Sequence, residues 1–99
     1  MYSDDLFNKV LSYTNDERRA RNITNTFMKV NPSFADVIEK WVYGAEPKYE
    51  YNGITLDIIC QKERCSYFSA LFRMAILLDN ADLANGYLRW TPVNYDWGR

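Results

Sequence analysis

The segment Tyr67–Leu78 constrains the fold most, because the helix that it would form is apolar on nearly every side. Ser66 precedes the segment as a good N-cap, and Asp79 and Asn80 can end the helix. Such a helix must be surrounded by protein or by lipid, and it is shorter than the roughly 20 residues that cross a bilayer. The sequence therefore predicts a core helix over residues 66–79 in a small all-α bundle of four to five helices, with no membrane contact.

The length and composition of the chain fit one domain over residues 1–99. Hydrophobic residues make up 47% of the chain and aromatic residues 16%, which is more aromatic surface than a small core can cover. We expect the remainder to form an interaction surface. With 12 basic and 13 acidic side chains, the chain lacks the positive field of most nucleic-acid binders. The N-terminus has no apolar stretch, so we expect no signal peptide.

Two helices are predicted before Pro32 from the helical spacing of apolar residues and from their caps. Ser3 can cap the first helix. Thr14 and Glu17 form a capping box at the start of the second helix. One long bent helix over residues 4–30 is the alternative.

Two further helices are predicted from caps and apolar spacing. Ser33 can cap a helix over Phe34–Tyr43, and Asn80 can cap a final helix over Ala81–Arg89. The side chains of the final helix that we expect to face inward are Leu83, Ala84, Tyr87 and Leu88.

The dipeptide Asn52-Gly53 is the strongest short hairpin signal in the chain. A minimal β-hairpin over residues 48–57 is one interpretation of the region, and a short helix over residues 56–61 capped by Thr55 is the other. We favour a tight turn or minimal hairpin followed by that helix. The cross-strand pairs of the hairpin would be Tyr51 with Ile54, Glu50 with Thr55, Tyr49 with Leu56, and Lys48 with Asp57.

The residue types present argue against catalysis and against a bound metal. The chain has no His, and its two cysteines, Cys60 and Cys65, cannot complete a tetrahedral zinc site alone. A cysteine nucleophile would also lack its usual basic partner. We therefore expect no enzyme, no catalytic residue, no cofactor and no small-molecule substrate. Two reduced thiols in a cytoplasmic protein are the favoured interpretation, and a disulfide or redox pair is the alternative.

The leading functional interpretation is a small non-catalytic regulator or inhibitor, of the kind found in phages and mobile elements, that binds another protein. Tyr, Trp and Arg are the residue types that dominate binding interfaces. The candidate partner-binding residues are Arg18, Arg19, Arg21, Tyr49, Tyr51, Trp90, Tyr95 and Trp97. A solvated helix face and closure of the core by the C-terminal aromatics are the alternative interpretations. A two-fold homodimer through those C-terminal aromatics is also expected.

The alternative function is a DNA-binding transcriptional regulator, because residues 55–79 resemble a helix-turn-helix. A capped short helix, a brief connection and a second capped helix follow one another. However, the turn has Arg64 where the motif usually has glycine, and the second helix offers a single basic residue for reading bases. Nucleic acid is therefore the less favoured partner. The candidate nucleic-acid-binding residues are Lys62, Arg64, Ser66, Ser69 and Arg73.

Overall fold

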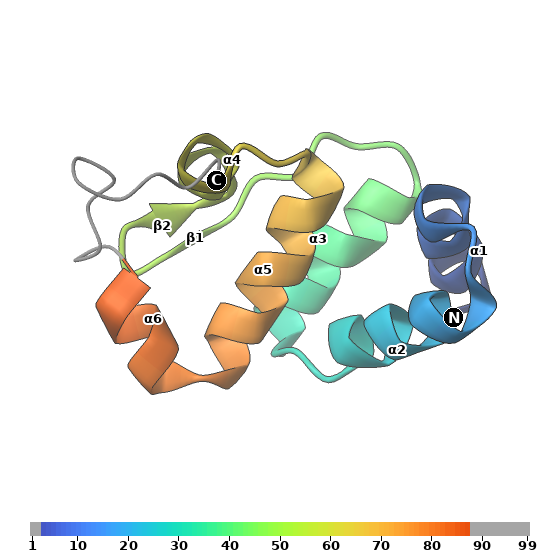
Figure 1. Cartoon of the computed structure of the whole chain (residues 1–99), viewed down its shortest axis with the longest axis horizontal. Coiled ribbons are helices and arrows are strands. Elements are labelled where there is room, and N and C mark those ends of the chain that lie inside the picture. The colour runs from blue at the N-terminus through green and yellow to red at the C-terminus, as the bar shows by residue number, and fades with distance from the viewer. Residues whose placement is uncertain (1–2, 88–99) are drawn as a thin grey trace. The chain divides into compact units, whose positions relative to one another are not determined.

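The computed structural model describes residues 3–87, and within that range the chain forms six α-helices and one two-stranded antiparallel sheet (Figure 1). The predicted all-α class with a minimal hairpin is confirmed, with more helices than the four to five expected. The chain divides into two compact units, Met1–Pro47 and Lys48–Arg99. The single-domain organisation stays a prediction. No helix within the described range is long and apolar enough to cross a membrane.

The first unit contains three helices whose apolar stripes are buried. They are α1 (Ser3–Thr14), α2 (Glu17–Met28) and α3 (Pro32–Val42), and α1 contacts both of the others. Asn15 takes a left-handed φ of 56°, which ends α1 and makes the single long helix wrong. Each helix contributes to the buried core, as its apolar spacing predicts. Fully buried side chains of this unit include Leu6, Val10, Ala20, Phe27, Phe34 and Ile38.

The helix caps of the first unit differ from those predicted. Asp16, and not Thr14, is the N-cap of α2, and its Oδ1 accepts a 3.1 Å hydrogen bond from the backbone N–H of Arg19. Asn31, and not Ser33, caps α3 by accepting a 2.9 Å bond from the backbone N–H three residues on. At both boundaries several Asx and hydroxyl side chains are adjacent, and sequence alone does not decide which one caps.

The second unit begins with the predicted hairpin, formed by β1 (Glu50–Tyr51) and β2 (Ile54–Thr55). Asn52 and Gly53 both have positive φ, 52° and 85°, as a type I′ turn requires. The paired residues are Glu50 with Thr55 and Tyr51 with Ile54, as predicted. The predicted pairs of Tyr49 with Leu56 and of Lys48 with Asp57 are wrong. Thr55 caps the helix that begins at Leu56, so the chain leaves the sheet there.

Three helices complete the second unit: α4 (Leu56–Glu63), α5 (Tyr67–Asp79) and α6 (Ala81–Tyr87). The core helix is confirmed, since α5 starts after the N-cap Ser66 and contacts both α4 and α6. Its fully buried side chains are Ala70, Leu71, Met74 and Ala75.

The inward face predicted for the final helix is partly wrong. Ala84 and Tyr87 are buried as expected, but the side chain of Leu83 is 47% exposed. Ala84 and Tyr87 lie three residues apart on the buried face, and Leu83, four residues before Tyr87, lies at the edge of that face and stays exposed. The remaining predicted residues of this helix, Leu88 and Arg89, lie outside the described residues.

Candidate partner-binding surfaces

The outer side of α2 carries much of the basic cluster. Residues three and four apart lie next to each other on a helix, so an exposed row forms opposite the buried stripe that contains Ala20 and Phe27. The carboxylate of Glu17, four residues before Arg21, borders this row at its start. We call the row the α2 face, and it consists of the exposed residues Arg18, Arg21, Asn22, Asn25, Met28 and Lys29. Arg19 is also exposed and lies at its flank.

The positive charge of the α2 face is not neutralised within the described part of the chain. Among residues 3–87, no ion pair holds the side chain of Arg18, Arg19 or Lys29. The guanidinium of Arg21 lies 5.7 Å from the centroid of the Phe7 ring, and this cation–π contact positions the side chain without removing its charge. The α2 face is therefore able to attract an anionic surface.

Two exposed tyrosines of the first unit were not predicted from the sequence. Tyr43, 62% exposed, donates a 2.8 Å hydrogen bond to Oδ2 of Asp5, and this bond raises the pKa of the phenol. Tyr13, 52% exposed, stacks at an angle on Trp41 with 5.9 Å between ring centroids. No local pattern distinguishes an exposed tyrosine from a core tyrosine, since both are common on amphipathic helices.

The aromatic residues predicted to bind a partner belong to a different unit from the arginines. Tyr49 and Tyr51 belong to the second unit and are half-buried beside the hairpin, whereas the arginines belong to the first unit. The C-terminal candidates Trp90, Tyr95 and Trp97 lie outside the described residues.

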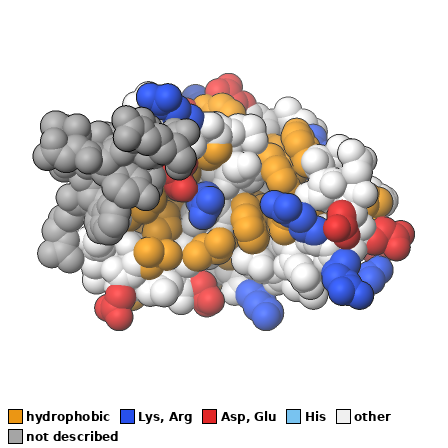
Figure 2. Space-filling view, in the orientation of Figure 1, with side chains coloured by type: hydrophobic (Ala, Val, Ile, Leu, Met, Phe, Trp, Pro, Cys, Tyr) orange, Lys and Arg blue, Asp and Glu red, His pale blue; other side chains and the backbone are white. Residues whose placement is uncertain are grey.

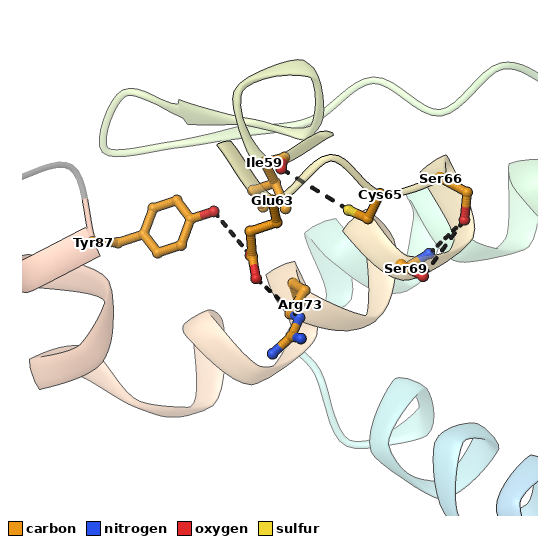
Figure 3. Close-up of polar contacts among 7 residues, drawn as sticks. All are labelled: Ile59, Glu63, Cys65, Ser66, Ser69, Arg73 and Tyr87. Atoms are coloured by element: carbon orange, nitrogen blue, oxygen red, sulfur yellow. Dashed lines mark hydrogen bonds and ion pairs between the residues drawn. The ribbon is translucent and has the colours of Figure 1, made fainter. Parts of the chain in front are cut away.

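The carboxylate of Glu63 joins the three helices of the second unit (Figure 3). Its Oε1 lies 3.3 Å from Nε of Arg73 on α5, and its Oε2 accepts a 3.0 Å hydrogen bond from the hydroxyl of Tyr87 on α6. The Glu63 side chain is only 15% exposed, whereas that of Arg73 is 57% exposed. Burial raises the pKa of Tyr87, and the nearby carboxylate raises it further. This cluster was missed because its residues are far apart in the sequence.

The helix-turn-helix order of the predicted DNA-binding segment is confirmed, but two of its three cations, Lys62 and Arg73, already have partners within the protein. Nζ of Lys62 donates a 2.8 Å hydrogen bond to the carbonyl oxygen of Tyr87, and burial lowers the pKa of this amine. Arg73 pairs with Glu63. The hydroxyls contribute little to a reading face, because Oγ of Ser66 caps α5 by accepting a 3.3 Å bond from the backbone N–H of Ser69. Arg64 is exposed.

A cavity of about 380 Å³ borders the Glu63 cluster between α5 and α6. Such a volume is typical of small pockets. Figure 2 shows hydrophobic side chains at the surface over these helices, with charged side chains among them. The apolar residues that line the cavity are Ile76, Leu77, Leu83, Gly86 and Tyr87. The charged residues that line it are Glu63, Arg73 and Asp82.

Cys60 and Cys65 are free, half-buried thiols that lie next to each other at the end of α4. Burial raises the pKa of both thiols, which disfavours the thiolate that a nucleophile requires. Within the part of the chain that the structure describes, no three acidic or sulfur ligands converge on a metal site.

No protein-family model, no curated protein and no solved structure matches the chain. Function is therefore inferred from the side chains themselves.

Proposed function

We propose that the protein is a non-catalytic binding protein that uses the α2 face to contact an acidic surface of a protein partner. The supporting observation is a row of exposed cations, Arg18, Arg21 and Lys29, with an exposed methionine, Met28. Arg and Met are enriched at protein interfaces, and a positive patch complements an acidic surface.

A protein partner is favoured over nucleic acid for electrostatic reasons. The chain as a whole has 12 basic and 13 acidic side chains, so no broad positive field surrounds the row. In the helix-turn-helix segment, Lys62 and Arg73 are already engaged by Tyr87 and Glu63.

Three further elements of the proposal have weaker support. A role without catalysis agrees with the absence of His and with the raised thiol pKa values of Cys60 and Cys65. A cytoplasmic location agrees with cysteines that are not bridged. A homodimer through Trp90, Tyr95 and Trp97 stays a prediction, because these residues lie outside the described range.

The test compares the wild-type chain with an Arg18→Ala, Arg21→Ala double variant. The matched control is Lys40→Ala, which removes an exposed cation that is paired with Asp36 at 3.0 Å. Proteins from the native host that the wild type and the control retain, but the double variant loses, are purified and titrated by calorimetry. Two interface arginines should together contribute at least about 1.4 kcal/mol, which corresponds to a tenfold weaker Kd.

Two outcomes would contradict the proposal. In the first, the double variant binds the purified partner as tightly as the control does. In the second, the wild type binds duplex DNA in fluorescence anisotropy, with an affinity that falls steeply with salt and depends on Arg18 and Arg21. The second result would favour the DNA-binding alternative, since counterion release accompanies phosphate contacts.

A further inference from the structure

Helix α4 ends in a turn that brings two cysteines together. The backbone N–H of Cys65 donates a 3.2 Å hydrogen bond to the carbonyl oxygen of Cys60, and Arg64 between them has a left-handed φ of 50°. These are the features of a Schellman motif, in which the side chains of the first and last residues of the turn commonly touch. Here both are cysteines, and the thiol of Cys65 donates a 3.9 Å hydrogen bond to the carbonyl oxygen of Ile59, the residue just before Cys60 (Figure 3).

We propose that Cys60 and Cys65 form a redox-modification site, at which a small disulfide oxidant such as glutathione disulfide converts both thiols into one intrachain disulfide. A disulfide needs two backbones close together and two side chains that point toward each other. The hydrogen bond between Cys65 N–H and Cys60 C=O meets the first condition. The Cys65 thiol supports the second, because it points back along α4 to the carbonyl oxygen of Ile59, next to Cys60. Both residues are also partly exposed, so a small oxidant can reach them.

The reaction proceeds by two thiol–disulfide exchanges. One cysteine loses its proton, which its raised pKa makes less frequent than for an exposed thiol, and the thiolate then attacks a sulfur of glutathione disulfide. The sulfur–sulfur bond of the oxidant breaks, one glutathione leaves, and a mixed disulfide remains on the protein. The other cysteine then loses its proton and attacks the protein sulfur of that mixed disulfide, which releases the second glutathione. The protein gives up two protons and two electrons, and one glutathione disulfide becomes two glutathiones.

The disulfide would fix the connection between α4 and α5. Glu63, whose carboxylate holds Arg73 and Tyr87, lies inside the loop that the disulfide closes. Oxidation would therefore restrain the backbone that carries this cluster. The proposed site is independent of the α2 face, which belongs to the first unit.

The experiment uses the full chain under native conditions. The protein is equilibrated with glutathione and glutathione disulfide, free thiols are trapped with N-ethylmaleimide, and the intact mass is measured. The expected product is a monomer without alkylation that has lost two hydrogen atoms. It should exceed the glutathione adduct at least about tenfold when free glutathione is kept well below the millimolar effective concentration of a tethered thiol.

Cys60→Ser and Cys65→Ser are the controls, and either one suffices if the other does not fold. Each should accumulate as the glutathione adduct, because no second thiol is present to displace glutathione. The proposal is overturned if the wild type accumulates as the adduct or as disulfide-linked dimers. It is also overturned if the intrachain disulfide forms in urea but not in the folded protein, since the folded turn is what is proposed to bring the thiols together.

Discussion

The hydroxyl of Tyr87 donates a 3.0 Å hydrogen bond to Oε2 of Glu63, and this bond joins α6 to the end of α4. The other oxygen of the same carboxylate pairs with Arg73 of α5. Since the Glu63 side chain is 15% exposed, water cannot fully replace a donor that is removed. Single substitutions in this cluster should therefore lower the free energy of unfolding.

Replacing Tyr87 by Phe should lower the free energy of unfolding by about 1.5–3 kcal/mol, the usual range for a hydrogen bond to a charged group. The measurement is urea unfolding, with a lower midpoint and an unchanged slope. Tyr43→Phe is the matched control, because it removes a 2.8 Å bond to the carboxylate of Asp5 at an exposed position. The control should cost about 0.5 kcal/mol or less. Equal losses in the two variants would contradict the role assigned to burial.

The stability of the second unit should fall in alkaline solution partly because of Tyr87. Burial and the carboxylate of Glu63 raise the pKa of this phenol above its ordinary value of 10.0. The unfolded chain therefore ionises first, so the contribution of Tyr87 is complete below about pH 10 and is lost as the pH rises toward the pKa of the folded state. Lys62, with a lowered pKa, acts in the opposite direction.

The comparison of wild type with Tyr87→Phe across this pH range isolates the phenol, because the aromatic ring and the backbone carbonyl that contact Lys62 remain. Urea midpoints of the two proteins should converge as the pH rises above 10. A constant difference between them would mean that Tyr87 ionises equally in both states.

Replacing Leu71 by Ala should cost about 2–5 kcal/mol, because this side chain of α5 is fully buried and its removal leaves a cavity. Leu83→Ala makes the same chemical change at a position that is 47% exposed, and it should cost about 0.5 kcal/mol or less. Both values come from urea unfolding. If the two costs were similar, the orientation of α6 described above would be wrong.

Replacing Asp16 by Ala should cost about 0.5–2 kcal/mol, since this residue is the N-cap of α2. Thr14→Ala should cost less, because the Thr14 hydroxyl interacts only with the backbone of Asp16 and leaves the cap in place. Thermal unfolding followed by circular dichroism compares the two variants. A larger loss at Thr14 would restore the capping box that the sequence predicted.

Local patterns of sequence predicted much of the fold. The apolar run before Asp79 gave the core helix, and Asn52-Gly53 gave both the turn and the register, because each signal acts over a few residues. The choice of Asp16 over Thr14 as a cap was not predictable, since the candidates differ by a fraction of the energy of one hydrogen bond.

The candidate sites were predicted less well than the fold. The arginines of α2 were found because they are close together in the sequence. The exposure of Met28 was not predicted, because the face on which a residue lies depends on where the helix begins. Glu63 and Tyr87 are 24 residues apart, and no local pattern pairs them. Arg73 was a candidate DNA contact only under the alternative function, and its ion pair with Glu63 could not be predicted because it depends on how α4 packs against α5.

Arg64 shows what a turn requires of its sequence. Its φ and ψ of 50° and 50° are those at which glycine is the least strained residue, yet the chain has a long charged side chain there. The neighbouring hydrogen bonds to the carbonyl oxygen of Cys60 define the turn, and they tolerate the extra Cβ. A pattern that demands glycine at this position would pass over this turn, whereas a pattern written in backbone angles would retrieve it.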